Sequence, residues 1–210
     1  MKPGVIRDWL RKAMFRYFEG PAVQTLVLLR VPPNLLTVVG FIIALGAACL
    51  AGFGMFLIAG FVFLSASVLD MLDGGLARAT NRVTPAGALL DSVTDRISEG
   101  AMLAALVVEA ALADMGESRL MATIVLLVGA LLFSQTVSYI RARGEGLGIS
   151  SKEGLMTRPE RVVLLSAGLM LQGVGLDPAL LVCVGVVAGF SLMTTVQRFI
   201  HVRAHLGQKE

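Results

Sequence analysis

The chain is dominated by long stretches without charge, separated by short polar segments. Residues 31–69 contain no charged residue, which is too long for one membrane-spanning helix of about 20 residues and right for two. We place the break between these two helices at Gly52 and Gly54, because closely spaced glycines favour a turn. Further apolar stretches follow at residues 97–112, 120–140, 162–176 and 178–197. The pattern predicts six spanning helices, since a helix satisfies its backbone hydrogen bonds within its own segment.

Composition supports an all-α integral membrane protein and excludes other classes. Of the 210 residues, 56% are hydrophobic and 16% are charged, and the mean hydropathy is +0.79. Soluble domains average roughly 45–50% apolar and ~25% charged residues. A disordered protein, a disulfide scaffold and an ordinary soluble enzyme are therefore excluded. Cys49 and Cys183 lie in apolar runs without metal-ligand spacing, so we interpret them as packing residues.

The basic residues indicate the orientation of the spans. Six spans place both termini on the same side of the membrane. Every Lys and Arg except Arg119 lies in or beside the segments of that side, namely residues 1–30, 79–84, 141–161 and the tail from 198. Short cytoplasmic segments are enriched in Lys and Arg. We therefore expect a multi-pass protein of the cell membrane with both termini in the cytoplasm.

Residues 1–20 have a different pattern. Apolar side chains recur every three to four positions and are opposed by basic ones; they are Val5, Ile6, Trp9, Leu10, Met14 and Tyr17 against Arg7, Arg11, Lys12 and Arg16. This pattern predicts a basic amphipathic helix lying in an anionic headgroup layer, or packed on the cytoplasmic face of the protein itself. The chain is thus divided into a juxtamembrane amphipathic helix, 1–20, and a six-helix membrane domain, 31–205.

Four aspartates are the main candidates for chemistry. Asp70 and Asp73 are three residues apart near the end of the second span, and Asp91 and Asp95 are four apart near the start of the third. Each pair shares one face of its helix, and a short turn makes the two helices antiparallel neighbours. Four converging carboxylates repel one another unless a cation lies among them. Oxygen ligands of this kind suit Mg²⁺ or Mn²⁺ better than zinc.

Two alternatives to a metal-dependent enzyme are open at this point. The aspartates could form a structural ion-pair cluster with Arg78, Arg82 and Arg96. A divalent-cation transporter is the second alternative, but spans one, four, five and six carry no charge near their midpoints. Enzyme chemistry is favoured by three residues near the aspartates. Gly74 allows a phosphorylated ligand to approach the backbone closely, Arg78 offers it a cation and Thr84 offers it a hydroxyl.

The acidic stretch also resembles a known family. The pattern Asp70-x2-Asp73-Gly74-x2-Ala77-Arg78-x8-Gly87-x3-Asp91-x3-Asp95 is similar, position for position, to the signature of the CDP-alcohol phosphotransferases. The likeness covers essentially the whole chain. It implies transfer of a substituted phosphate from a CDP-linked donor to an alcohol, with release of CMP. The segment PNLLT, residues 33–37, resembles the start of the family's first span, which borders the cytidine diphosphate pocket.

The resemblance implies roles for particular residues. It implies two Mg²⁺ ions, with Mn²⁺ as the alternative, held by Asp70, Asp73, Asp91 and Asp95. Asp95 is also implied as the general base that takes the proton of the acceptor hydroxyl. The residues implied in binding CDP-diacylglycerol are Asn34, Leu35, Leu36, Thr37, Gly74, Arg78 and Thr84. A homodimer is implied as well, and no nucleic-acid partner is expected.

Basic segments beyond the aspartates indicate the acceptor. SQTVSYIRARGE, RPERVVLL and VQR resemble the phosphatidylinositol-phosphate synthase branch of the family. The resemblance implies inositol 1-phosphate (1D-myo-inositol 3-phosphate) as acceptor, with its phosphate on Arg141, Arg161 and Arg198. Arg141 departs from the branch, where lysine is frequent. Glycerol 3-phosphate, the acceptor of a phosphatidylglycerophosphate synthase, and serine are the alternatives, and positive-inside topology alone also explains an excess of arginine.

Overall fold

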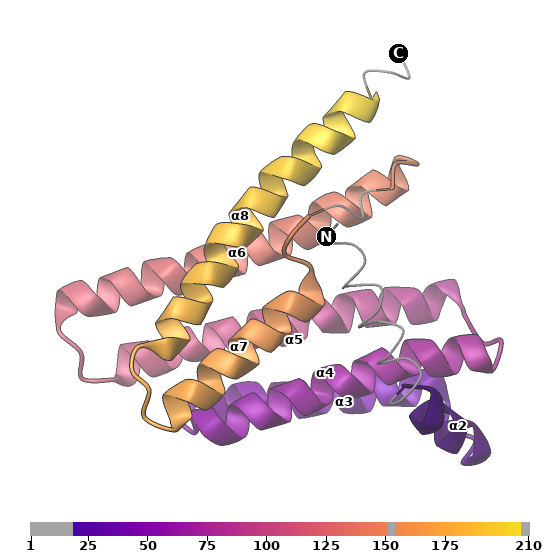
Figure 1. Cartoon of the computed structure of the whole chain (residues 1–210), viewed down its shortest axis with the longest axis horizontal. Coiled ribbons are helices and arrows are strands. Elements are labelled where there is room, and N and C mark those ends of the chain that lie inside the picture. Colours follow the sequence, from indigo (N-terminus) through magenta and orange to yellow (C-terminus); the bar gives the residue numbers. More distant parts are fainter. Residues whose placement is uncertain (1–18, 151–153, 207–210) are drawn as a thin grey trace, which may run out of the picture.

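The structure, a computed structural model, describes residues 19–150 and 154–206. Within these ranges it is helical (Figure 1). A short helix α2 (Gly20–Leu28) precedes six longer ones: α3 (Pro33–Gly52), α4 (Phe56–Ala79), α5 (Pro85–Leu112), α6 (Glu117–Gly146), α7 (Arg158–Gly173) and α8 (Ala179–Leu206). The amphipathic helix expected at 1–20 lies outside the described residues, apart from Glu19 and Gly20.

The boundaries of the long helices follow local sequence signals. Proline occupies the first turn of α3, α5 and α7, where its missing N–H costs no helical hydrogen bond. Thr157 and Glu160 form a reciprocal capping box at the start of α7. The break expected within residues 31–69 is confirmed: α3 ends at Gly52, and Gly54 has a φ of +75°, a left-handed conformation that glycine adopts without strain.

Helix α5, which is the third of the long helices, is longer than its apolar stretch. The apolar stretch covers residues 97–112, whereas α5 begins at Pro85, in agreement with the expected position of Asp91 and Asp95 near the start of this span. Its first three turns carry Asp91 and Asp95, so the helix continues through a polar region that hydropathy alone leaves out. Helices α4, α6 and α8 extend beyond the C-terminal ends of their apolar stretches, whereas α7 begins and ends a few residues earlier than its stretch.

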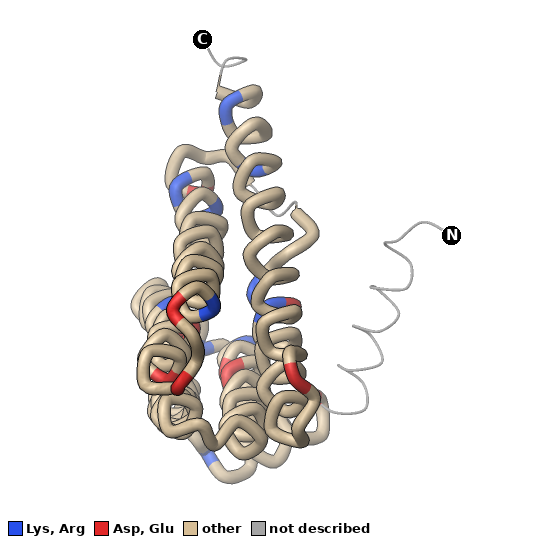
Figure 2. The backbone as a smooth tube through the Cα atoms, turned by 90° about the vertical axis from the view of Figure 1, so that its left-hand side faces the viewer, with Lys and Arg blue, Asp and Glu red and all other residues tan. Residues whose placement is uncertain are grey.

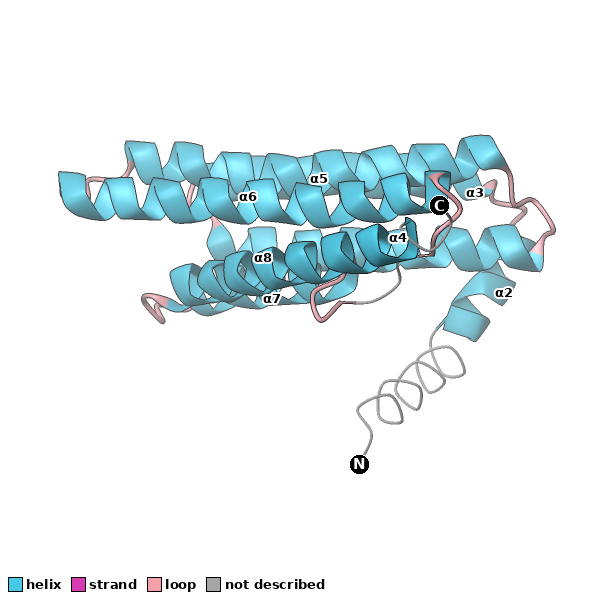
Figure 3. Cartoon of the chain, turned by 90° about the horizontal axis from the view of Figure 1, so that it is seen from above, coloured by secondary structure: helices cyan, strands magenta, loops and turns pink. Residues whose placement is uncertain are grey.

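The six long helices enclose one core. Neighbours follow the order α3, α4, α7, α8, α6, α5 and back to α3, while α2 packs on α4. Figure 3 shows α5 beside α6 and α7 beside α8. Small side chains such as Ala47 and Ala51 of α3 and Ala59 of α4 line the interior. A Cβ on Gly60 would lie only 2.9 Å from the carbonyl oxygen of Ser166, so α4 and α7 approach closely, as in membrane bundles.

The outer surface is apolar. Large hydrophobic side chains on every long helix are exposed, for example Ile42, Phe61, Val125 and Phe199, and few charged residues interrupt the helices (Figure 2). Helices α3, α4, α6 and α8 are each long and apolar enough to cross a membrane, whose hydrocarbon core needs about 20 residues. The structure is therefore that of an all-helical membrane protein.

Candidate active site

The four aspartates come from two antiparallel helices joined by a tight turn. Asp70 and Asp73 lie within the last three turns of α4, and Asp91 and Asp95 within the first three turns of α5. At the end of the turn, the hydroxyl oxygen of Thr84 accepts a hydrogen bond from the Gly87 N–H at 3.0 Å. This cap fixes where α5 begins and so which turns of α5 face α4.

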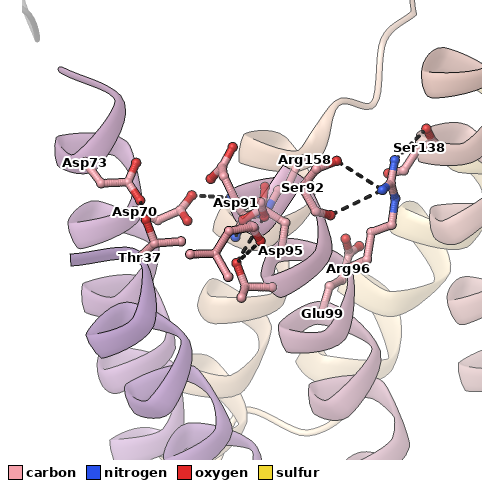
Figure 4. Close-up of polar contacts among 12 residues, drawn as sticks. Thr37, Asp70, Asp73, Asp91, Ser92, Asp95, Arg96, Glu99, Ser138 and Arg158 are labelled. Atoms are coloured by element: carbon pink, nitrogen blue, oxygen red, sulfur yellow. Dashed lines mark hydrogen bonds and ion pairs between the residues drawn. The ribbon is translucent and has the colours of Figure 1, made fainter. Parts of the chain in front are cut away.

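Three of the four carboxylates converge (Figure 4). One oxygen each from Asp70, Asp91 and Asp95 lies within 4.8 Å of the others, and all three residues are half-buried. Asp73 is buried and accepts a hydrogen bond from the hydroxyl of Thr37 on α3. The structure thus brings three of the predicted metal ligands together and turns the fourth toward α3.

A guanidinium lies against this cluster. Arg158, the first residue of α7, forms ion pairs with Asp70 and with Asp95, the latter at 2.6 Å between Nη2 and Oδ1. The Arg158 side chain is only 25% exposed and the two aspartates 17%, so solvent screens these pairs little. Arg158 therefore neutralises part of the cluster, a role that the sequence pattern did not reveal.

The cluster fits a divalent cation. Three carboxylates against one guanidinium leave two negative charges in a half-buried site, and carboxylate oxygens are the ligands that Mg²⁺ and Mn²⁺ prefer. Like charges this close are unfavourable without a counter-ion. Asp70, Asp91 and Asp95 supply the oxygens for such an ion, and Asp73 is one turn of α4 away from Asp70.

A cavity of about 260 Å³ opens on one side of the cluster. We call it the Arg78 cavity; it is lined by Pro33, Asn34, Thr37, Asp73, Gly74, Ala77, Arg78, Arg82, Val83, Thr84, Gly87, Ala88 and Asp91. It contains five of the residues predicted to bind the CDP-linked donor. A Cβ on Gly87 would lie 3.2 Å from Oδ1 of Asn34, so a glycine there lets α3 and α5 approach at the cavity wall.

Two predicted donor-binding residues are not among those lining residues. Leu36 is buried and packs against Val23, Leu72 and Leu76, whereas Leu35 is 49% exposed on the outside of α3. The helical period explains the difference, because Asn34 and Thr37 share one face of α3 and the two residues between them point elsewhere.

A second cavity, of about 310 Å³, opens on the other side. We call it the Arg161 cavity; it is lined by Ala88, Asp91, Ser92, Asp95, Arg96, Glu99, Val137, Ser138, Arg141, Ala142, Glu145, Thr157, Arg158, Arg161 and Arg198. All three arginines predicted to bind the acceptor phosphate belong to it. They come from α6, α7 and α8, so the ends of three helices form one basic wall.

The three arginines differ in how they are held. Arg161 is buried and makes a two-pronged ion pair with Glu99 of α5, at 2.6 Å from Nε and 2.7 Å from Nη2. Arg198 is buried as well and donates from Nη1 to the carbonyl oxygen of Val137 at 2.9 Å. Arg141 is half exposed and pairs with Glu145 at 3.0 Å. Two of the arginines are thus held inside the protein, and the third is partly exposed to solvent.

The two cavities meet at the aspartates. Ala88 and Asp91 line both, whereas Asp73 lines the Arg78 cavity and Asp95 the Arg161 cavity. A ligand in each cavity would bring its reacting end to the same group of carboxylates. The two cavities together offer space for two ligands beside the same carboxylates.

Comparison with known proteins agrees with this geometry. Residues 30–196 match the family described as CDP-alcohol phosphatidyltransferase. The chain belongs to the CDP-alcohol phosphatidyltransferase family, and it is an enzyme of that class.

Its relatives include phosphatidylinositol phosphate synthases. It is 35% identical over 182 residues to the phosphatidylinositol phosphate synthase of Corynebacterium glutamicum, covering 86% of this chain and 81% of the relative. Two crystal structures of the Mycobacterium tuberculosis phosphatidylinositol phosphate synthase are similar at 30% identity. The one with CDP-DAG bound gives a TM-score of 0.78 over 88% of this chain and 93% of that one. The one with manganese and citrate gives 0.79 over 88% of each.

Sequence reasoning missed three residues of the site. Arg158 forms an ion pair with Asp70 of the aspartate cluster, and Glu99 forms one with Arg161. Glu19, just before α2, pairs with Arg78 at 3.2 Å. Glu99 follows Asp95 by four residues and so shares its helix face, which was an available signal. For Arg158 and Glu19 the partner lies on another helix far away in the chain, and no local pattern reveals such a contact.

Proposed function

We propose that the chain transfers the phosphatidyl group of CDP-diacylglycerol to inositol 1-phosphate (1D-myo-inositol 3-phosphate), giving phosphatidylinositol phosphate and CMP. The observation that carries this proposal is the pair of cavities meeting at Asp91. One contains the nucleotide-binding motif of the family, and the other is walled by arginines suited to a phosphorylated acceptor. The named relatives support the same donor and the same acceptor.

The donor nucleotide is assigned to the Arg78 cavity. There the guanidinium of Arg78, 66% exposed in its side chain, pairs with the diphosphate, and Asn34 and Thr37 contact the nucleotide from α3. The apolar outer faces of the neighbouring helices leave the diacyl chains in lipid. This arrangement keeps a charged headgroup in a polar cavity while the hydrocarbon stays in the membrane.

A divalent cation completes the aspartate cluster. We assign two ions, Mg²⁺ with Mn²⁺ as the alternative, to Asp70, Asp73, Asp91 and Asp95; the manganese in the tuberculosis enzyme supports a divalent metal of this type. When bound, such ions neutralise charge on the diphosphate and on the leaving CMP. The carboxylates themselves orient the phosphates relative to the second cavity.

Asp95 is assigned as the general base, because it lines the Arg161 cavity, to which the acceptor is assigned. The hydroxyl proton passes to a carboxylate oxygen of Asp95 while the acceptor oxygen forms a bond to the phosphorus that carries diacylglycerol. The bond from this phosphorus to the bridging oxygen breaks, and CMP leaves with the electron pair. Arg158, 2.6 Å from Asp95, holds that carboxylate in place.

The acceptor phosphate is assigned to Arg141, Arg161 and Arg198. Arginine is suited to this role because its planar guanidinium grips two phosphate oxygens and stays charged. Arg161 lines this cavity, and its contacts with Glu99 use Nε and Nη2. A phosphate on the acceptor is thus recognised independently of the hydroxyl that reacts.

We further infer six membrane spans, α3 to α8, in the plasma membrane, with both termini and the site on the cytoplasmic side, and a homodimeric assembly. Among the described residues, Arg119 is the one Lys or Arg near the loops at the opposite end of the helices, which supports this orientation. Assignment of residues 1–20 to an interfacial helix and of 31–205 to the membrane domain completes the proposed topology.

The test is CMP release from CDP-diacylglycerol by the purified full chain with a panel of acceptors. Inositol phosphate should give the fastest release. Serine and unphosphorylated inositol lack the phosphate and should each be at least about tenfold slower, because a lost charged hydrogen bond costs roughly 1.5–3 kcal/mol. Glycerol 3-phosphate keeps the phosphate and should be slower than inositol phosphate because it lacks the ring. Chelation with EDTA should stop release, and Mg²⁺ or Mn²⁺ should restore it. Equal rates with inositol and its phosphate would overturn the acceptor, and preference for glycerol 3-phosphate would make the chain a phosphatidylglycerophosphate synthase.

A further inference from the structure

The start of α2 is tied to the rim of the Arg78 cavity. Oε1 of Glu19 lies 3.2 Å from Nη2 of Arg78, and the Glu19 side chain is only 11% exposed while that of Arg78 is 66% exposed. Removing a carboxylate this far from water is costly unless it is paired, and the partner of this one is a largely solvated arginine. The mechanism above makes no use of Glu19.

Close packing of α2 on α4 brings this carboxylate to its partner. A Cβ on Gly75 would lie 2.6 Å from Oε1 of Glu19 and 3.0 Å from Cγ2 of Val23. A methyl group at this position would displace the Glu19 carboxylate and crowd Val23. Val23 is buried with Leu72 and Leu76 of α4, which fixes the position of α2 and therefore of Glu19.

The same contact fixes the direction of Arg78. Its Nη1 lies 3.3 Å from where a Cβ of Gly74 would be, so the guanidinium folds back over Gly74, a residue that lines the Arg78 cavity. An exposed arginine loses much rotamer freedom when it binds a ligand. Pairing with Glu19 removes part of that freedom before the ligand arrives and leaves the other N–H groups of Arg78 available.

We propose that Glu19 is a positioning residue for the CDP moiety of the donor, acting by holding Arg78 over Gly74. The inference rests on the proposed function for the identity of the ligand. It adds α2 to the donor site: the helix preceding the first span is part of the machinery that binds the nucleotide. It also predicts that Glu19 has no direct role with the acceptor, whose arginines lie in the Arg161 cavity.

The first test compares wild type with Glu19→Gln in the full chain. Glutamine keeps the shape and loses the charge, so the KM for CDP-diacylglycerol should rise about three- to tenfold, with kcat and the KM for inositol phosphate unchanged within twofold. Glu117→Gln is the matched control, because Glu117 is exposed at the far end of α6; it should change none of these constants. An unchanged donor KM, or an equal rise in both KM values, would overturn the proposal.

Two further variants separate positioning from a general structural role. Gly75→Ala pushes the Glu19 carboxylate away and should reproduce the donor-specific rise. In an Arg78→Ala background, Glu19→Gln should add less than about twofold; a full additional effect would show that Glu19 does not act through Arg78. Binding of free CDP, measured by calorimetry for wild type and Glu19→Gln, keeps the two proposals apart. Failure of wild type to release CMP refutes the proposed function, whereas equal CDP affinities refute the role of Glu19.

Discussion

Replacing Arg161 by alanine is expected to lower the stability of the protein as well as its affinity for the acceptor. The Arg161 and Glu99 side chains are 1% and 3% exposed and are joined by two contacts, of 2.6 and 2.7 Å. Alanine leaves Glu99 as a buried charge without its main partner. Breaking a buried pair in this way costs about 3–5 kcal/mol in the free energy of unfolding.

For a chain of this size, each kcal/mol lowers the midpoint of thermal unfolding by about 2–4 °C, so Arg161→Ala should lower it by about 6–20 °C. The measurement is thermal unfolding of the variants in one detergent. Replacement of both residues, Glu99→Leu with Arg161→Leu, should restore most of the loss, because no charge is then buried alone. Arg141→Ala is the control: its pair with Glu145 is half exposed and is worth less than about 1 kcal/mol.

Activity of the double variant then isolates binding from folding. It should fold nearly as well as wild type and still show a KM for inositol phosphate at least about tenfold higher, since Arg161 no longer contributes a cation. If the stability losses of the single variants Arg161→Leu and Glu99→Leu add up to the loss of the double variant, Arg161 and Glu99 are not coupled and the expected destabilisation is refuted. If the double variant has a normal acceptor KM, Arg161 does not bind the phosphate.

Two more predictions concern the aspartates. Asp95→Asn, assayed with saturating Mg²⁺, should lower kcat by at least about a hundredfold. The KM for CDP-diacylglycerol should change little, because Asp95 lines the Arg161 cavity. Near-normal turnover would refute the assignment of Asp95 as the general base. Thr37→Val deletes the hydrogen bond to Asp73 and should raise the KM for CDP-diacylglycerol about two- to tenfold. An equal rise in the KM for inositol phosphate would contradict the assignment of Asp73 to the donor side of the site.

The helices were predictable because hydropathy reports directly on what lipid requires. The break after Gly52 and the turn before Pro85 carry strong local signals, and both are present. The apolar stretch at 97–112 covers only part of α5, since the first turns of this helix face a polar site rather than lipid. The start of α5 was indicated instead by the turn before Pro85 and by the spacing of Asp91 and Asp95. Helix α2 was not predicted at all: it is stabilised by Val23 packing on α4, and this tertiary contact has no signature in nine residues.

The site was predictable where one helix holds its members at fixed spacing. Asp91 and Asp95 share a face by the helical period alone, and Asp70 joins them through the short turn. Contacts between distant helices were not predictable. The position of Arg158 between Asp70 and Asp95 depends on where α7 crosses α4, and the number of residues between them says nothing about that crossing.

The Arg78 cavity is built entirely from residues 33–91, and the Arg161 cavity from residues 88–198. Helix α5 is the one long helix that contributes to both. With the proposed assignments, the first half of the chain binds the nucleotide, the second half binds the acceptor, and α5 carries carboxylates that face both. Substitutions in α6, α7 and α8 should therefore change the preferred alcohol without changing the KM for the donor.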